Sequence, residues 1–524
     1  MTWEPELKEL ERRSAFAEAM GGPKRIADQR ERGKLTIRER IDLLFDPDSF
    51  MERGKHAGTG AYDKDGNLVD FFPSAYITGV GEVDGRPVVA GGGDFTARPP
   101  SGSEGVRVNT GRAVPKSGHD ERTALEMKIP LVRLIDGFGA DIRGTAGIGR
   151  TYIPELRGWP LAASLMSEVP VVSMSLGAVA GLPAAQVAIA HFAIMVDGIS
   201  QVFAAGPPVV ERSLGQKVTK EELGGVKIHA HQSGLVDNVA KDEADAFQQV
   251  RRFLSYLPSS VYQLPPVQPS DDPIDRREEA LLSIVPRERN RPQNTRRMLN
   301  LILDEGSLFE IGRYFGPSQV TAFARLNGHP VGVLAGDPMH SGGATDAASA
   351  QKLESFIDLC DTFHLPIVNF ADNPGFMIGP QAEASGTLRL GARALCAMDA
   401  STIPWATVIV RKAYGVAGAA HQPYNRYVYR IAWPSGEWGS IPIEGGVQAA
   451  YRREIESADD PKQRRGEIET ELIALRSPFG ALEAFNAEDI VDPRDTRKLL
   501  CKWVKMAYAK LPADVGRKTR PMRP

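Results

Sequence analysis

A succession of strand, glycine-rich loop, helix, strand and glycine turn occurs twice in this chain. In the second half the loop covers residues 369–376, and an apolar run from Pro404 then ends in a turn at Gly415. In the first half we predict a strand over 171–175 and a glycine turn over 177–181, so the turn glycine Gly181 lies eleven positions after Pro170, just as Gly415 lies eleven after Pro404. This repetition constrains the fold strongly, because the same kind of domain has to form twice.

Three further pairs of anchors follow the same order in both halves. The pairs are Pro87 to Asp94 with Pro330 to Asp337, Pro130 to Asp136 with Pro366 to Asp372, and 41–50 with 299–308. The offset between partners drifts from 258 to 234 residues, which is the length of a domain and far longer than a solenoid repeat. We therefore predict a duplicated α/β domain, with one copy in 1–260 and the other in 293–524. Residues 261–292, which are rich in proline and charge, are predicted to be a linker.

Composition indicates a globular protein. At 524 residues, 42% hydrophobic and 25% charged, the chain is long enough for two domains and too apolar to be disordered. A net charge of −3 gives no reason to expect a nucleic acid or a membrane surface as a partner. The acidic N-terminus lacks the apolar core of a signal peptide. The apolar segment 169–199 is broken by glycine and proline, so we expect buried strand and helix there rather than a membrane span.

Cysteine and histidine patterns argue against a metal site. Cys360, Cys396 and Cys501 lie far apart and form no Cys-x-x-Cys pair, which excludes a zinc ribbon. So few cysteines are typical of a cytoplasmic protein, and we expect each to be a buried small apolar residue. His229 and His231 have metal-ligand spacing only if they lie on a strand, and the sequence shows no third ligand. No metal is therefore expected in this chain.

The two glycine turns indicate chemistry that uses backbone donors. Small residues at the end of an apolar strand let a ligand approach the N–H groups of the following turn. Such donors form an oxyanion hole when negative charge develops on a bound ligand. Ordinary tight loops between strands and helices are the alternative interpretation. The chain has neither the Gly-x-Ser-x-Gly elbow of a serine hydrolase nor a Gly-x-x-x-x-Gly-Lys-Ser/Thr phosphate loop.

Cations concentrate in two segments of the first half. The basic run 30–41 contains Thr36 followed three residues later by Glu39, which predicts a helix N-terminus with a capping box. The segment 97–119 is a long polar stretch with the cations Arg98, Arg107, Arg112 and Lys116. Long loops in compact domains are usually functional, so these cations are candidates for binding phosphates. A solvated surface loop is the alternative.

Five motifs spread over almost the whole chain carry a family resemblance. They are Arg32-Gly-Lys-Leu-Thr-Ile-Arg-Glu-Arg-Ile-Asp-Leu-Leu, Asp372-Asn-Pro-Gly-Phe, Arg411-Lys-Ala-Tyr-Gly, Ala432-Trp-Pro-Ser-Gly-Glu and Asp492-Pro-Arg-Asp-Thr-Arg. Together they resemble the carboxyltransferase β-subunit family of biotin-dependent acyl-CoA carboxylases, of the propionyl-CoA carboxylase type. The resemblance implies an α/β fold of two tandem crotonase-like (ClpP/crotonase) ββα-superhelix domains. It also implies an enzyme that moves a carboxyl group from carboxybiotin to the α-carbon of an acyl-CoA.

The same resemblance implies partners for the chain. Biotin is expected on the biotin carboxyl carrier domain of a biotin carboxylase subunit, because this chain has no Met-Lys-Met biotinylation sequence. Acyl-CoA is expected as the second substrate. The family pattern is a ring-shaped homo-hexamer, a trimer of dimers, in which the first domain of one subunit meets the second domain of another.

The family's site residues map onto the two turns of this sequence. The resemblance implies oxyanion donors at Gly181 and Leu182 on the acyl-CoA side, and at Val416 and Ala417 on the biotin side. Further residues expected on the acyl-CoA side are Gly139, Ala140, Arg107, Arg112, Lys116 and Ala419. Further residues expected on the biotin side are Pro374, Gly375, Phe376, Tyr414 and Gly415.

The chain departs from the family pattern at both turns. The family's Gly-Gly-Ala is Gly181-Leu182-Pro183 here, and proline has no N–H. The family's Ser-Gly-Gly-Ala-Arg becomes 137–141, which ends in aspartate, and its Gly-Gly-Ala-Tyr-Asp becomes 415–419, which ends in alanine. The alanine leaves a roomier apolar pocket, so specificity for propionyl-CoA does not follow from the resemblance. Two alternative functions follow: the carboxyltransferase subunit of an acyl-CoA decarboxylase, and a non-catalytic scaffolding paralogue of the β-subunit.

Overall fold

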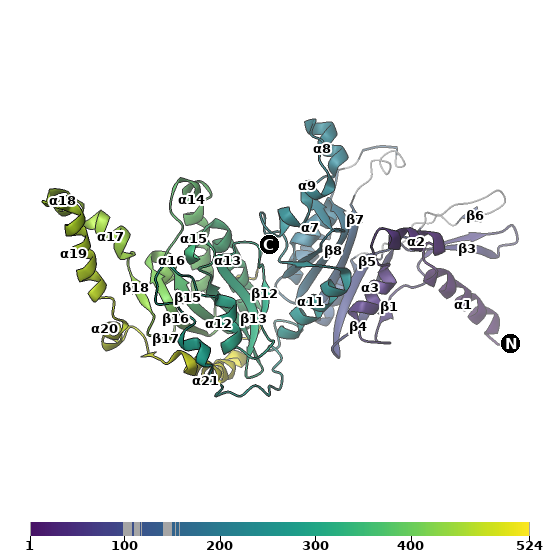
Figure 1. Ribbon diagram of the computed structural model, residues 1–524. Helices are drawn as coiled ribbons and strands as arrows, with labels where there is room; N and C mark the ends of the chain where they lie inside the picture. Colours follow the sequence, from purple (N-terminus) through teal and green to yellow (C-terminus); the bar gives the residue numbers. More distant parts are fainter. Residues whose placement is uncertain are drawn as a thin grey trace. The chain divides into compact units, whose positions relative to one another are not determined.

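The computed structural model describes residues 2–97, 107–108, 116, 118–139, 149–151, 153–156 and 158–522. The described chain forms two compact units that divide between Ser255 and Tyr256. Each unit is built on one large mixed sheet flanked by helices (Figure 1).

The sheet of the first unit has the strand order β1-β4-β5-β7-β8-β9-β11, and β10 pairs with the end of β8. Its strands are β1 (Met51–Glu52), β4 (Tyr76–Val83), β5 (Arg86–Gly93), β7 (Leu131–Phe138), β8 (Val171–Ala180), β9 (Phe192–Val196), β10 (Gln201–Phe203) and β11 (Asn238–Ala240). A small second sheet consists of β2 (Gly58–Tyr62), β3 (Leu68–Pro73) and β6 (Arg107–Val108). The helices are α1 (Glu4–Glu18), α2 (Pro23–Glu31), α3 (Ile37–Leu44), α4 (His119–Met127), α6 (Trp159–Leu165), α7 (Leu182–Ala188), α8 (Pro207–Leu214), α9 (Lys220–Gly224), α10 (Val226–His229) and α11 (Glu243–Tyr256).

The sheet of the second unit has the strand order β12-β13-β14-β15-β16-β17-β19, and β18 pairs with the end of β16. Its strands are β12 (Phe309–Ile311), β13 (Gln319–Leu326), β14 (His329–Gly336), β15 (Ile367–Asn373), β16 (Trp405–Tyr414), β17 (Tyr429–Ala432), β18 (Glu437–Gly439) and β19 (Asp489–Ile490). The longer helices are α12 (Thr295–Ile302), α13 (Ala347–Thr362), α15 (Thr387–Ala400), α17 (Ile443–Ala450), α19 (Pro461–Ala474) and α21 (Thr496–Lys510). The shorter ones are α14 (Pro380–Ala384), α16 (Gly415–Ala419), α18 (Arg452–Ser457), α20 (Pro478–Glu483) and the 3₁₀ turns η1 (Glu279–Leu282), η2 (Ser341–Gly343), η3 (Pro493–Asp495) and η4 (Leu511–Ala513).

The two sheets match strand for strand. In each, the first two strand pairs are antiparallel and the remaining pairs are parallel. Each also has a bulge at the same place, after Ile135 on β7 and after Ala371 on β15, and the bulged residue is an aspartate in both. The prediction of a duplicated α/β domain is confirmed.

Burial explains why these segments form central strands. All five residues of β9 and all eight of β13 are buried, as expected for strands covered on both faces. β9 is a continuous apolar run, whereas β13 also buries Gln319, Thr321 and Arg325. In the second unit, Leu500 and Val504 of α21 pack into the same core as Val333 and Val408 from the sheet. The apolar segment 169–199 is strand and helix, as predicted, and none of the helices in the described ranges has the length and apolarity to cross a lipid bilayer.

The strand that leads to the first turn is longer than predicted. We expected it to end at Ser175 and 177–181 to form the turn, but β8 continues to Ala180. Residues 178–180 pair with β10, and this second partner satisfies backbone N–H and C=O groups that a turn would leave to solvent. The turn therefore begins only at Gly181.

The burial expected for Cys396 is wrong. Cys360 and Cys501 are buried as expected, but Cys396 is exposed. It lies on α15 outside the stripe formed by Gly391, Ala394 and Met398, which faces the core.

Local chain signals were partly confirmed. Thr36 and Glu39 form both hydrogen bonds of the expected capping box. His229 lies on a helix rather than on a strand, and its Nε2 is 2.6 Å from the Val202 carbonyl oxygen. Residues 261–292 lie within the second unit, where buried side chains from this segment join the core.

Candidate active site

The second glycine turn lies where β16 ends and α16 begins (Figure 1). Gly415 has φ = +61°, a left-handed conformation that glycine adopts without the steric cost of a side chain. Val416 and Ala417 follow in the first turn of α16, where backbone N–H groups have no partner within the helix. The Val416 side chain is exposed and the Ala417 side chain is buried. The turn therefore offers backbone donors at the N-terminal end of α16.

The loop that follows β15 lies beside this turn. Gly375 has φ = +123°, and a Cβ at this position would lie 3.6 Å from the Tyr414 carbonyl oxygen. The Gly375 carbonyl accepts a hydrogen bond from Thr345 N at 3.0 Å, which fixes the loop. The ring of Phe376 lies on Gly391 of α15, where any side chain would overlap it. Loop and turn are thus neighbours within one unit.

A buried ion pair joins the two strand ends that carry this loop and turn. Asp372, at the bulge of β15, accepts hydrogen bonds from Arg411 Nη2 at 3.0 Å and from Arg411 Nε at 3.3 Å. Both side chains are buried; burial raises the pKa of Asp372, and Arg411 opposes this change. Because Arg411 lies four residues before Gly415, the pair fixes the end of β16 just ahead of the turn.

The first glycine turn has the same form in the first unit. Gly181 has φ = +72° and leads into α7, whose first residue is Leu182. The Leu182 side chain is exposed, and Pro183 supplies no N–H to the turn. Gly139 lies against this turn: its N–H donates to the Ala180 carbonyl at 3.1 Å, and a Cβ on it would lie 3.2 Å from Leu182 N. The structure therefore brings together three of the residues expected on the acyl-CoA side.

The carboxylate at the bulge of β7 is paired with a cation from another part of the chain rather than from the adjoining strand. Asp136 accepts two hydrogen bonds from Lys34 Nζ, at 2.9 and 3.0 Å, and lies 3.6 Å from Arg40 Nη1. Burial raises the pKa of Asp136, and Lys34 opposes this change. The position that corresponds to Arg411 is Gly177, where a Cβ would overlap both Asp136 Oδ1 and Lys34 Nζ. Glycine on β8 thus leaves room for Lys34, which comes from the loop between α2 and α3.

The cations predicted to bind phosphates are only partly described. Arg107 lies in β6, with its backbone opposite Tyr62 of β2, while Arg112 and Ala140 lie outside the described residues. Lys116 is 9% exposed and lies 3.7 Å from Glu52 Oε1, so its ammonium already has an anionic partner. Burial lowers the pKa of Lys116, and Glu52 opposes this change.

A cavity of about 40 Å³ lies beneath the second turn. Its lining includes Ala417 and Gly418 of α16, Phe376 of the adjacent loop, and His421. This volume accommodates one water molecule. The Ala419 side chain is exposed, and its carbonyl accepts a hydrogen bond from Tyr424 Oη at 3.1 Å.

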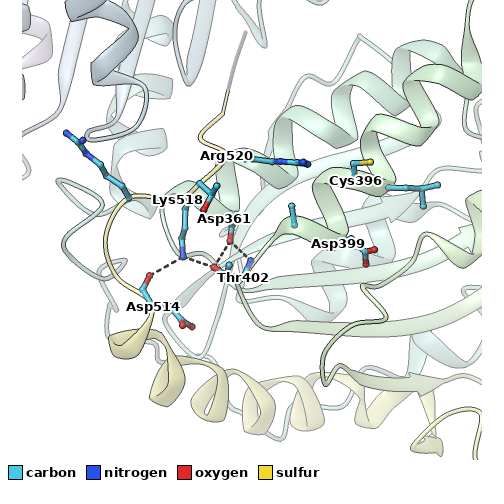
Figure 2. A pocket seen from close by; sticks show the side chains of 11 residues that line it. Asp361, Cys396, Asp399, Thr402, Asp514, Lys518 and Arg520 are labelled. Atoms are coloured by element: carbon cyan, nitrogen blue, oxygen red, sulfur yellow. Dashed lines mark hydrogen bonds between the residues drawn. The ribbon is translucent and has the colours of Figure 1, made fainter.

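A larger pocket of about 670 Å³ is lined by other residues of α15 and by the C-terminal segment (Figure 2). Figure 2 shows Lys518 donating to Thr402 and to Asp514, and Thr402 in turn bonded to Asp361. The Lys518 distances are 2.7 Å to Thr402 Oγ1 and 3.0 Å to the Asp514 carbonyl oxygen. None of the predicted site residues lines this pocket. We assign these hydrogen bonds the role of fastening the C-terminal segment.

Sequence reasoning missed two residues next to the turns. Lys34 stands within a motif that the sequence analysis singled out, but nothing in that motif shows that it contacts Asp136, 102 residues away. His421 is an isolated histidine, and no local pattern distinguishes it from a structural one.

Comparison with known proteins gives one consistent result. The family model described as "Carboxyl transferase domain" matches residues 28–522. The chain is 36% identical to the propionyl-CoA carboxylase carboxyltransferase subunit of Haloferax mediterranei, over 99% of both chains. It is 31% identical to the methylmalonyl-CoA decarboxylase subunit alpha of Veillonella parvula, over 97% of both chains. The crystal structure of the transcarboxylase 12S hexamer with methylmalonyl-coenzyme A superimposes with a TM-score of 0.85 at 30% identity, covering 99% of this chain and 97% of the other.

Proposed function

Because the chain belongs to the carboxyl transferase domain family, with its tandem crotonase-like fold, we propose that it is the carboxyltransferase subunit of an acyl-CoA carboxylase. In this role it moves a carboxyl group from carboxybiotin to the α-carbon of an acyl-CoA. The observation that carries the proposal is the pair of equivalent strand-to-helix turns at Gly181 and Gly415. The reaction places negative charge on two oxygens, one on each substrate, and each turn supplies backbone donors for one of them.

We assign the first turn to the acyl-CoA thioester. Its oxygen becomes negative when the α-proton leaves, and the N–H groups of Gly181 and Leu182 are the donors assigned to it. Gly139 has no side chain, which keeps the approach to Leu182 N open. Since Pro183 lacks an N–H, the donor set of this turn is confined to its first residues.

We assign the second turn to biotin, and the residues present fit that group. Carboxybiotin, held by a carrier domain of a partner subunit, supplies the carboxyl group when bound. A ureido oxygen takes two N–H donors, which Val416 and Ala417 provide at the start of α16. The bicyclic ring system needs an apolar wall beside those donors, and Phe376, whose ring lies on Gly391, provides it.

The remaining groups of the two turns serve to hold charge and position. Asp136 and Asp372 lie at the bulges of the strands beside the two turns, and each is already paired, with Lys34 and Arg411 respectively. A carboxylate so paired is a poor general base, because taking up a proton would break its ion pair. We therefore assign this chain catalysis by oriented backbone donors and by fixed placement of two substrates, rather than by a side-chain base.

We also propose that the chain works as a homo-hexamer, a trimer of dimers whose active site combines turns from different subunits. Large apolar side chains are exposed on segments that adjoin the second turn: Ile378, Leu388, Val416, Tyr424 and Tyr427. Such a concentration is typical of surfaces that another subunit covers. The assembly of the transcarboxylase 12S relative, which is a hexamer, supports the same proposal. The three unpaired thiols support a reducing, cytoplasmic location.

Reconstitution with a biotinylated carrier and a biotin carboxylase subunit tests the function. With ATP, labelled bicarbonate and a series of acyl-CoAs, we expect label to appear in an acid-stable acyl-CoA product. The decarboxylase reading, which the Veillonella parvula relative favours, predicts instead that the chain carboxylates the carrier from a malonyl-type CoA but receives no carboxyl group from a carboxylase. A folded oligomer that exchanges no carboxyl group in either direction would support the scaffolding paralogue.

A further inference from the structure

His421 lies just behind the second turn and bonds to it directly. Its Nδ1 is 2.6 Å from the Gly418 carbonyl oxygen, within α16. A carbonyl oxygen only accepts hydrogen bonds, so Nδ1 carries the proton in this contact. The side chain is 8% exposed, which keeps water from competing for the bond.

The backbone of His421 is tied to the interior of the sheet. Its carbonyl oxygen accepts from Asn369 Nδ2 at 2.9 Å and from Thr407 Oγ1 at 2.8 Å. Asn369 lies on β15 and Thr407 on β16, the two strands that end at the loop and the turn, and both side chains are buried. His421 is therefore a link between a rigid part of the second unit and the five-residue helix that carries Val416 and Ala417.

The second ring nitrogen of His421 is left for a ligand. Among the described residues Nε2 has no hydrogen-bond partner, although it is buried. His421 lines the cavity of about 40 Å³, together with Ala417 and Gly418. With the proton on Nδ1, Nε2 is an acceptor, and a single water molecule satisfies it within that volume.

We propose that His421 is a positioning residue for carboxyl transfer, which holds the Gly418 carbonyl through Nδ1–H and binds a buried water through Nε2. By fixing α16 from behind, it directs the N–H groups of Val416 and Ala417 toward the oxygen they stabilise. The inference rests on the function proposed for this turn. Oxyanion donors act because they are oriented before the reaction, and a displacement of about 1 Å costs about 100-fold in rate.

Two polar substitutions separate the effect of losing the hydrogen bond to Gly418 from the effect of placing any polar side chain at this buried position. In His421→Asn the side-chain amide nitrogen can occupy the place of Nδ1 and donate to Gly418. In His421→Gln the amide reaches instead toward the place of Nε2, so that the donor to Gly418 is lost. We expect kcat of His421→Gln to fall roughly 10- to 100-fold with KM for acyl-CoA nearly unchanged, and His421→Asn to stay within about threefold of the wild type.

Hydrogen exchange gives a readout that does not depend on activity. The Ala420 N–H donates to the Val416 carbonyl at 3.1 Å, so exchange in the peptide 415–421 reports opening of α16. We expect faster exchange in His421→Gln than in His421→Asn or the wild type. His364→Leu serves as control, because His364 is also buried but contacts the Val261 carbonyl rather than the turn.

The outcomes distinguish a failure of the proposed function from a failure of the positioning role of His421. If the wild-type chain transfers no carboxyl group but the exchange pattern holds, the proposed function fails and His421 still orders the turn. If His421→Gln folds and has the kcat and the exchange rate of the wild type, the positioning role is overturned. It is also overturned if His421→Asn loses as much activity as His421→Gln. If His421→Gln does not fold, a loss of kcat in His421→Asn without a change in Tm overturns the proposal on its own.

Discussion

At the residue scale, one carboxylate position is neutralised in two different ways. Asp136 and Asp372 occupy the same bulge in the two sheets. In the second unit the cation is Arg411 on the adjoining strand, and in the first it is Lys34 from the N-terminal segment, which reaches the carboxylate because position 177 is glycine. A buried carboxylate requires such a partner, since an unpaired buried charge is strongly destabilising. Duplication thus kept the acid while the source of the cation changed.

Substitution of Gly177 tests this arrangement. In Gly177→Ala the new Cβ would overlap both Asp136 Oδ1 and Lys34 Nζ, so the ion pair has to separate. We expect a loss of stability of about 3 kcal/mol, measured as a lower unfolding midpoint. Gly158→Ala is the matched control, because a Cβ there meets no atom within 4 Å. Equal midpoints for the two variants would show that the pair tolerates displacement.

The donor role proposed for Ala417 gives a second prediction at this scale. Ala417→Pro removes the N–H and fixes φ, whereas Ala417→Gly keeps the donor. Loss of one oxyanion donor typically costs about 100- to 1000-fold in turnover. We therefore expect that loss in kcat for Ala417→Pro and a much smaller one for Ala417→Gly, with folding checked by circular dichroism. A folded Ala417→Pro with near-normal kcat would remove Ala417 from the oxyanion site.

At the scale of elements, helices supply the groups that hold strand ends in place. α13 carries Lys352, which is 8% exposed and donates from Nζ to the Gly312 carbonyl at 3.0 Å. Burial lowers the pKa of Lys352 from 10.5 to about 7, against the opposing influence of Glu310. A buried amine that loses its proton so readily makes the stability of this element depend on pH.

The sign of that dependence follows from proton uptake. Between pH 7 and 10.5 the unfolded chain binds a proton at Lys352 that the folded chain releases, so this group makes stability rise with pH. Its contribution to the slope is at most about 1.4 kcal/mol per pH unit. In Lys352→Met we expect the unfolding free energy to rise less with pH than in the wild type, measured by denaturant titration from pH 7 to 9.5. Parallel pH profiles would contradict the buried, depressed amine.

The cationic segment of the first unit gives a prediction that separates its members. Neutral glutamine at Arg107 and Arg112 should raise KM for acyl-CoA in a salt-sensitive way if these side chains meet the CoA phosphates. Lys116→Gln should act mainly on stability, because its ammonium is buried against Glu52. Steady-state kinetics at two salt concentrations, with Tm measured in parallel, distinguishes the two effects. An unchanged KM in the arginine double variant would show that these residues belong to the protein surface and do not contact acyl-CoA.

At the scale of the whole molecule, the proposed active site combines one turn from each of two subunits, so activity is expected to require an oligomer. If each active site needs turns from two subunits, specific activity should fall when the enzyme is diluted below its dissociation constant. We expect Ile378→Asp, which puts a charge on an apolar residue that is 86% exposed, to lower both the oligomer mass and the activity. Met506→Asp, at an exposed position on α21, is the control. Full activity in a monomer identified by light scattering would contradict the shared site.

What the sequence by itself determined lies in short-range spacing. The eleven positions from proline to turn glycine and the pattern of Thr36 and Glu39 depend on neighbouring residues. The anchors recur in the same order along the sequence. All three can therefore be recognised without knowledge of the fold. The duplicated sheet and the glycine turns at Gly181 and Gly415 followed from those patterns.

Only the tertiary structure decided which distant groups meet. β8 runs past its predicted end because β10 pairs with it, and Lys34 reaches Asp136 across 102 residues. His421 lines a cavity to which the sheet, α13, α15 and α16 all contribute residues. None of these contacts leaves a periodic trace in the sequence, since each depends on the packing of separate elements. The glycines of the two turns were predictable from local spacing, whereas the side chains that hold the turns in place depend on long-range packing.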